Sequence, residues 1–286
     1  MSSRVWLIYA MITTLLWGVW GALIETPEKA GFPATLGYSV WALTMIPCAL
    51  VALKVINWRL EYDKRSVFLG SMVGLLGAGG QLILFQALRS GPAYMVFPII
   101  SLYPVITIIL GVWLLKEHAN RRSWIGIALA LIAIFLLSYQ SPENSVAKGM
   151  MWLFLAFFVF FFWGIQAYVM KFANERMQAE SIFFYMMATS VVLIPIALLM
   201  TDFSQEINWG FKGPYLAAMI QVLNAVGALM FVYAMRYGKA IIVVPMTALA
   251  PVITIVLSLI IYAVIPHPIT IAGMVCAVTA IYLMAE

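Results

Sequence analysis

Long apolar runs separated by short polar segments dominate the chain. Ten of these runs approach the roughly 20 residues that a helix needs to cross a bilayer. They are 4–24, 33–53, 67–88, 92–115, 122–139, 149–171, 179–200, 213–235, 239–263 and 268–285. Lipid offers backbone groups no hydrogen-bond partner, and the runs are too uniformly apolar for barrel strands. The pattern therefore predicts an all-α integral membrane protein with ten transmembrane helices.

A second pattern is a repetition within the chain. Residues 87–110 and 234–257 are identical at 13 of 24 positions when they are aligned with a constant offset of 147. The pair Trp17-Gly18 recurs as Trp163-Gly164 at nearly the same offset. Duplicated halves in an apolar chain are typical of secondary transporters.

Lysine and arginine positions predict the orientation. With the amino terminus in the cytoplasm, the inner segments contain 12 of the 16 basic residues and the outer loops contain 4. We therefore expect a protein of the cytoplasmic (inner) membrane with both termini in the cytoplasm. Five helices per repeat is an odd number, so the second repeat, 148–286, is expected to be inverted relative to the first, 1–140.

Composition and charge exclude several classes of protein. The chain is 65% hydrophobic and 9% charged, whereas soluble domains are about 25% charged. The net charge is +5, but the basic residues are scattered and form no patch, so nucleic acid is not an expected partner. Cys48 and Cys276 have no disulfide or metal spacing, and we expect neither a metal nor a cofactor. No GxxxxGK[ST] motif is present, so ATP hydrolysis by this chain is not supported.

The repeated motifs resemble those of the EamA-type members of the drug/metabolite transporter superfamily. The resemblance rests on the Trp-Gly pairs, the two helices with paired prolines, and the sequence Leu114–Glu117 that closes the fourth helix. It implies that helices 1–4 and 6–9 surround a central cavity, and that a small metabolite, such as an amino acid, is moved outward. The chain departs from the pattern at Ala263-Val264, which replace the Lys-Glu pair in the second half.

Aromatic and amide side chains within the predicted spans are the candidates for substrate binding. Aromatic rings suit apolar or cationic groups, and amides suit carboxylates or hydroxyls. The alternatives are that amides bond between helices and that aromatic residues mark the membrane interface. The candidates are Trp17, Gln81, Tyr94, Trp163, Gln166 and Asn224.

Paired prolines mark the fourth and ninth predicted helices. Pro98 and Pro104 correspond to Pro245 and Pro251 at the offset of 147. Each proline removes a backbone hydrogen bond, so each helix is expected to kink or to unwind locally. The prediction is a hinge or gate, and the alternative is a simple bend.

Three charged residues at helix ends are further candidates. Lys116 and Glu117 end the fourth helix on the predicted cytoplasmic side, where they form either a gate that exchanges ion-pair partners or a solvated helix end. Glu25 shares a helix face with small residues and is the candidate for coupling to a proton or ion. Its alternative is a place in a hydrated turn, because Pro27 limits the helix.

These features favour a secondary transporter that works by alternating access. The substrate is expected to be a zwitterionic, cationic or amphiphilic small molecule, because no fixed positive charge falls within the middle of a span. A channel or sensor could use the same helices. A membrane-embedded enzyme is disfavoured, because the two histidines are remote from each other and from acids. Gly126 and Gly273 mark a packing surface, either within the chain or in a homodimer.

Overall fold

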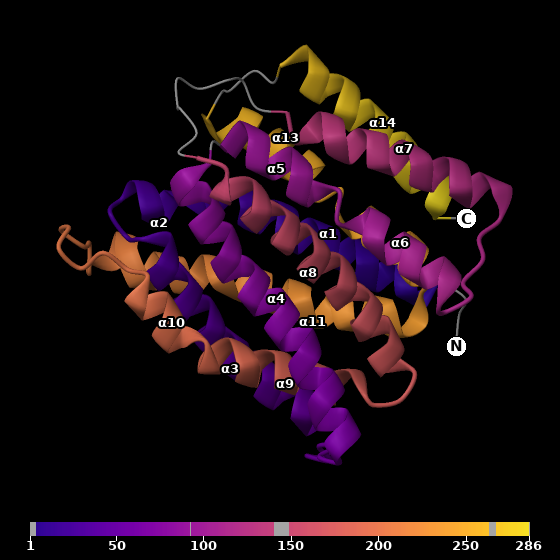
Figure 1. Cartoon of the computed structure of the whole chain (residues 1–286), viewed down its shortest axis with the longest axis horizontal. Coiled ribbons are helices and arrows are strands. Elements are labelled where there is room, and N and C mark those ends of the chain that lie inside the picture. The colour runs from indigo at the N-terminus through magenta and orange to yellow at the C-terminus, as the bar shows by residue number, and fades with distance from the viewer. Residues whose placement is uncertain (1–3, 92, 140–148, 263–266, 286) are drawn as a thin grey trace.

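The computed structural model describes residues 4–91, 93–139, 149–262 and 267–285, with the side chains at 93, 94 and 262 excepted. None of these residues lies in a strand, and the helices form one bundle (Figure 1). The helices are α1 (Val5–Leu23), α2 (Glu25–Lys29), α3 (Ala34–Val55), α4 (Lys64–Ser90), α5 (Ala93–Ser101), α6 (Pro104–Trp113), α7 (Arg121–Leu137), α8 (Met151–Asn174), α9 (Ala179–Val192), α10 (Ile194–Leu199), the π-helical turn η1 (Phe211–Tyr215), α11 (Leu216–Tyr237), α12 (Ala240–Thr247), α13 (Pro251–Tyr262) and α14 (Pro268–Met284).

Eight helices or runs of consecutive helices in the described part are long and apolar enough to cross a membrane. They include α5 with α6, α9 with α10, and α12 with α13. The helices α7 and α14 have 17 residues each, which is shorter than the others. The all-helical membrane architecture predicted from the sequence is therefore confirmed.

The predicted proline kinks are present as breaks between helices. The run 92–115 forms α5 and α6, which are separated at residues 102–103, and the run 239–263 forms α12 and α13, which are separated at residues 248–250. Pro104 and Pro251 are the first residues of α6 and α13, where the missing N–H costs no helical hydrogen bond. The third break, at Leu193 between α9 and α10, was not predicted, although Pro195 in the first turn of α10 explains it.

Helices that correspond at the offset of about 147 make corresponding packing contacts. In the first half of the chain, α1 packs on α11 and α13, and in the second half α8 packs on α4 and α6. The helices α7 and α14 pack extensively on each other and lie side by side along one edge of the bundle (Figure 1). Each helix therefore has its main contacts with helices of the other half.

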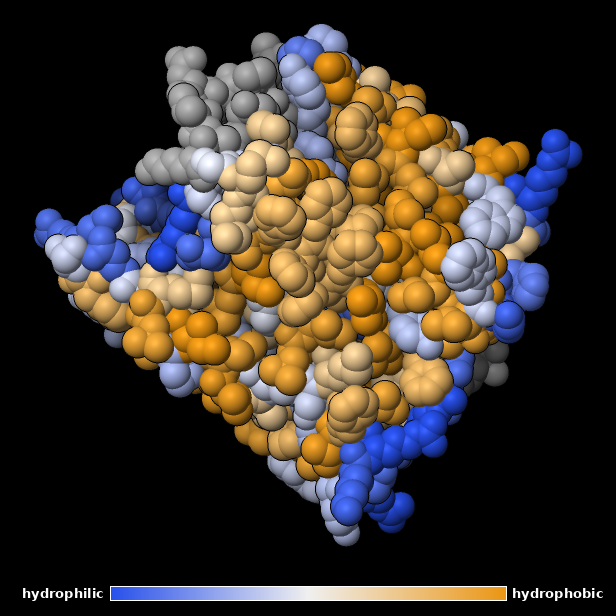
Figure 2. All heavy atoms as spheres, in the orientation of Figure 1, coloured by the Kyte–Doolittle hydropathy of each residue, from blue (hydrophilic) through white to orange (hydrophobic). Residues whose placement is uncertain are grey.

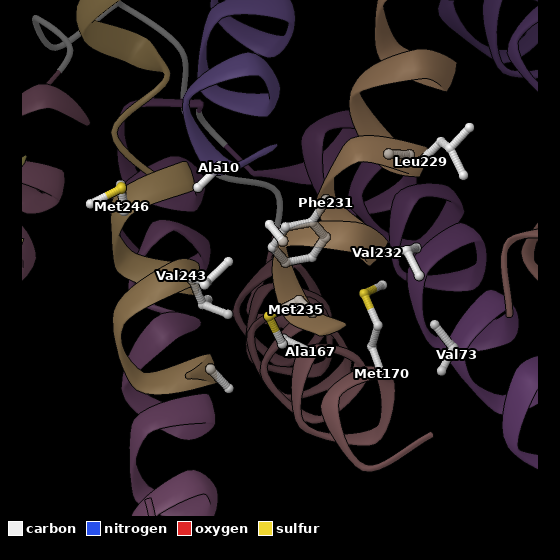
Figure 3. Close-up of a cluster of buried hydrophobic side chains, with 14 of the residues drawn as sticks. Ala10, Val73, Ala167, Met170, Leu229, Phe231, Val232, Met235, Val243 and Met246 are labelled. Atoms are coloured by element: carbon white, nitrogen blue, oxygen red, sulfur yellow. The ribbon is translucent and has the colours of Figure 1, made fainter. Parts of the chain in front are cut away.

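Apolar side chains cover the face formed by α4 and α8, with hydrophilic side chains at the corners of the molecule (Figure 2). Phe154, Phe158 and Phe161 of α8 are each at least 45% exposed. Large exposed apolar residues on a membrane-spanning helix are in contact with lipid. Within the bundle, side chains of α1, α4, α8, α11 and α12 meet in a buried cluster that includes Met170, Met235 and Val243 (Figure 3).

Polar side chains cap the starts of α4 and α7. The Asp63 carboxylate accepts hydrogen bonds from Arg65 N at 3.1 Å and Ser66 N at 3.2 Å at the start of α4. The Ser66 hydroxyl and backbone N–H hold the pKa of the Asp63 carboxyl below its ordinary value. Asn120 caps α7 in the same way, with Oδ1 2.7 Å from Ser123 N. These caps supply acceptors for N–H groups of the first helical turn, which have no partner within the helix.

Candidate functional site

Each half of the chain places a tryptophan against a glycine of the other half. The indole Nε1 of Trp17 donates to the backbone oxygen of Asn224 at 3.4 Å, and that of Trp163 donates to the backbone oxygen of Gly77 at 3.3 Å. Asn224 and Gly77 are 147 residues apart. A Cβ atom at Gly80 would lie 2.6 Å from the Trp163 ring, so only glycine leaves room for this indole.

Two threonines make a second pair of equivalent contacts. The Thr254 hydroxyl of α13 donates to the backbone oxygen of Gly18 in α1 at 2.8 Å. The Thr107 hydroxyl of α6 donates to the backbone oxygen of Gly164 in α8 at 2.9 Å. A Cβ atom at either glycine would lie 2.5 Å from an isoleucine Cβ of the facing helix. The helix backbones therefore approach closely at both places.

Three amide side chains lie beside these contacts. Gln166 of α8 lies against Gly77 of α4, and Gln81 follows Gly77 by one turn on the same face. Asn224 of α11 lies beside Trp17 of α1. The side chains of Gln81, Gln166 and Asn224 are half-buried, and none of them hydrogen-bonds to another described residue. An amide in hydrocarbon needs a partner, so these groups are free to bind water or a ligand.

The structure thus brings together two groups of the predicted binding residues. Trp163, Gln166 and Gln81 meet at the middle of α4, and Trp17 meets Asn224 at the corresponding part of α11. The Tyr94 side chain lies outside the described residues. Other amides at this level serve in packing: Gln221 accepts from Trp20 Nε1 at 3.0 Å and donates to the backbone oxygen of Gly37 at 3.2 Å.

Glu117 binds the start of α12 directly. Its two carboxylate oxygens accept hydrogen bonds from Ala240 N at 2.9 Å and Ile241 N at 3.0 Å. These N–H groups belong to the first helical turn and have no acceptor within the helix. The helix dipole stabilises a negative charge at this position. Lys116 is exposed and takes no part. In this structure the Glu117 carboxylate therefore binds backbone N–H groups of the other half, a contact that we name the Glu117 latch.

Two lysines strengthen the same end of the bundle, where α6, α8 and α11 terminate. We name it the basic end. Lys171 of α8 donates to the backbone oxygens of Met235 at 3.0 Å and Gly238 at 2.7 Å. Lys239 donates to the backbone oxygen of His118, close to Glu117. The Lys239 contact joins the two halves of the chain at this end, and the Lys171 contacts join α8 to the end of α11 within the second half.

The two ends of the bundle differ in how tightly they are packed. At the basic end, α12 packs on α6, α7 and α8, and Val244 and Met246 are fully buried. At the opposite end, α5 packs chiefly on α8. Phe97 and Ile99 of α5, which correspond to Val244 and Met246 at the offset of 147, are only half-buried. The same segment is thus enclosed in one half and partly open in the other.

The predicted coupling residue, Glu25, lies at the looser end. Its carboxylate is 67% exposed and is 2.7 Å from Lys29 Nζ, one turn along. The segment Glu25–Lys29 continues as the short helix α2 despite Pro27, because proline is tolerated in the first turn of a helix. This exposed pair matches the hydrated-turn alternative for this segment.

Sequence reasoning missed a buried acid, Glu180. It is 8% exposed, and its Oε1 accepts a hydrogen bond from the Tyr233 hydroxyl at 2.6 Å. Tyr233 stacks on Tyr9 of α1 with ring centroids 5.2 Å apart, so the pair links α9, α11 and α1. The sequence signal that could have identified it is a lone acid in the first turn of an apolar helix.

The sequence profile of the EamA-like transporter family matches residues 4–139 and 150–285. The chain belongs to the EamA-like transporter family. This confirms the resemblance found in the repeated motifs. EamA-like proteins are membrane transporters, and the assignment therefore places the chain among transporters rather than enzymes.

Relatives of known name are distant. Protein LicB of Haemophilus influenzae is 24% identical over 210 residues, which cover 70% of each chain. A probable 4-amino-4-deoxy-L-arabinose-phosphoundecaprenol flippase subunit, ArnE of Proteus mirabilis, is 28% identical over 91 residues, which cover 30% of this chain and 80% of that protein. One crystal structure superposes with a TM-score of 0.78 over 96% of this chain and 97% of that one, and at 15% identity it shows the fold alone.

Neighbouring glycines of α4 provide a matched test of the interface between the halves. Gly80→Val is expected to lower the thermal stability of the purified protein by about 1–3 kcal/mol, because the new side chain overlaps the Trp163 indole. Gly79→Val is the control, because a Cβ atom there meets no described atom within 4 Å. The measurement is the melting midpoint, with the folded fraction at each temperature determined by size-exclusion chromatography. Equal midpoints for the two variants would contradict the packing.

Proposed function

We propose that this chain is a secondary transporter of the cytoplasmic membrane that moves a small solute by alternating access. Its ten spans form two inverted five-helix repeats, divided near residues 140–148, and both termini lie in the cytoplasm. The observation that carries the proposal is a difference between contacts. Contacts in the middle of the bundle recur at the offset of 147, whereas contacts at the two ends do not.

Inverted repeats explain this difference. If the halves exchange shapes, a contact made in both halves is kept, and a contact made at one end only must break. The threonine and tryptophan contacts belong to the first kind and serve as pivots. The Glu117 latch and the contact between Lys239 and His118 belong to the second kind and serve as the cytoplasmic gate. In this arrangement the cytoplasmic gate is closed and the outer side is the more open one.

The solute is proposed to bind between the pivots in a central cavity. Gln81, Gln166 and Asn224 supply amide groups without hydrogen-bond partners among the described residues, and Trp17, Trp163 and Tyr94 supply aromatic rings. Amides orient a carboxylate or hydroxyl, and rings attract a cationic or apolar group. We therefore propose a zwitterionic, cationic or amphiphilic solute, with an amino acid as the first candidate and export as the direction. Pro98, Pro104, Pro245 and Pro251 are the proposed hinges, and Glu25 is the proposed coupling group.

A lipid-linked amino sugar is a second candidate for the solute. Two relatives are named as probable flippase subunits for 4-amino-4-deoxy-L-arabinose-phosphoundecaprenol, at 28% and 29% identity over about a third of this chain. Such a molecule is an amphiphile with an amino group, so it falls within the same chemical range. The two candidates differ in the assay that detects them, because only the lipid-linked sugar changes leaflet.

Labelling of single cysteines tests the inversion of the repeats. Ser90→Cys and Tyr237→Cys lie 147 residues apart, and each is made with Cys48 and Cys276 replaced by serine. In intact cells, an impermeant maleimide is expected to label residue 90 and not residue 237. Permeabilised cells, in which both positions should react, are the control. Labelling of both residues from one side would refute the inverted topology.

The Glu117 latch is tested by the exposure of the residues it encloses. Glu117→Gln removes the charge that binds the two N–H groups of α12, so the cytoplasmic gate is expected to open more often. A Val244→Cys reporter, buried in the parent protein, should then react at least several-fold faster with a maleimide in inside-out vesicles. Lys116→Gln, at the exposed neighbouring residue, should leave the rate unchanged. An unchanged rate in the Glu117→Gln variant would remove the latch from the gate.

Gln81→Ala tests the binding site in proteoliposomes. A thermal-shift screen against amino acids and amines first selects the solute, and counterflow of that solute is then measured with radiolabel. Loss of the Gln81 amide is expected to raise the half-saturating concentration about tenfold, which corresponds to one lost hydrogen bond to a charged group. Gln205→Ala, in an exposed segment, is the control. Saturable counterflow also separates a transporter from a channel, because an open pore shows none.

A further inference from the structure

A groove of about 730 Å³ lies on the lipid-facing side of the first half of α4. It is lined along α4 by residues at spacings of three and four, from Lys64 to Leu76, and Phe162 of α8 lines it as well. This spacing places the lining on one face of the helix. The groove is separate from the glycines and amides of the candidate binding site, which lie further along α4.

The groove has the length of one lipid leaflet. Twelve residues of helix, from Lys64 to Leu76, rise about 18 Å. Half of the hydrocarbon core of a bilayer is about 15 Å thick. An acyl chain that enters beside Lys64 would therefore reach Leu76 near the bilayer centre. The exposed ring of Phe68 and the half-buried ring of Phe162 line this path, and Ser71 contributes its one short polar side chain.

The two ends of the groove differ in charge. Lys64 is exposed, and its Nζ has no hydrogen bond or ion pair with any residue that the structure describes. Tyr62, which is 83% exposed, brings a hydroxyl to the same end. The carboxylate of Asp63, between them in the sequence, is engaged by Arg65 N and Ser66 at the helix cap. The groove thus ends in the hydrogen-bond donors of Lys64 and Tyr62, which have no acceptor among the described residues, and it is apolar toward the bilayer centre.

We infer that this groove binds one acyl chain of an anionic phospholipid, with the lipid phosphate at Lys64 and Tyr62. In the orientation proposed above, this lipid belongs to the cytoplasmic leaflet. An anionic headgroup is favoured over phosphatidylcholine because its charge is not balanced by a headgroup cation next to Lys64. The lipid is a resident ligand rather than a transported solute, since it sits outside the bundle on the lipid-facing surface.

Native mass spectrometry of the full chain tests this site without any transport assay. The delipidated protein is mixed with phosphatidylglycerol or phosphatidylcholine of the same acyl chains, and the retained lipid is counted. Phosphatidylglycerol is expected to be retained about fivefold better, the difference that one lysine near the surface provides. Lys64→Gln should abolish the preference, and Lys54→Gln, an equally exposed lysine at the end of α3, should keep it.

A second variant tests the groove itself. Ser71→Trp fills the path of the acyl chain and should reduce the retention of both lipids, while glycerol phosphate without acyl chains should not compete with either. Equal retention of the two lipids by the parent protein would overturn the proposal. So would an equal loss in Lys54→Gln and Lys64→Gln, or full retention by Ser71→Trp. Because only binding is measured, these outcomes are independent of whether the transport proposal holds.

Discussion

Close approach of helix backbones at glycine is the constraint on which the rest of this structure depends. In a bilayer, helices gain no hydrophobic energy by leaving lipid for each other, so packing and interhelical hydrogen bonds must hold them together. Gly18 and Gly164 allow α13 and α6 to come near enough for the threonine hydroxyls to reach backbone oxygens. Gly227 and Gly80 leave room for the two indoles. The positions of the unpaired amides follow from these contacts, because the amides project beside them.

The recurrence of these contacts at the offset of 147 separates what holds the bundle from what sets its state. If the two halves are inverted repeats, as proposed, a contact present in both halves contributes equally to either arrangement, so it does not favour one of them. The Glu117 latch does favour one. Two hydrogen bonds to a carboxylate stabilise by about 3–6 kcal/mol together, and a shift from 1:99 to 99:1 in a two-state equilibrium needs about 5.5 kcal/mol. In the proposed transporter the latch is therefore comparable in size to the bias that closes one end.

The sequence predicted those features that depend on local pattern. Apolar run length identified the membrane helices, and the prolines identified the breaks before Pro104 and Pro251. It did not predict the partner of Glu117, because the start of α12 is 123 residues away. The burial of Glu180 was missed, and the choice between the two readings of Glu25 stayed open, for a related reason: both depend on how a helix is rotated and what packs on it. Run length and residue spacing contain no information on either.

The two ends of the molecule cannot be energetically equal, because the residues that form the latch occur once. Glu117 corresponds to Val264 at the offset of 147, and Val264 lies outside the described residues. A valine side chain has no acceptor for the N–H groups of a helix start. In the proposed transporter the solute-free protein therefore rests with its basic end closed. A ligand shifts such an equilibrium only by its differential affinity for the two states. The solute must then offset the lost latch with bonds of its own, and the amides of Gln81, Gln166 and Asn224, which bond to no other residue in the described part of the chain, can provide them.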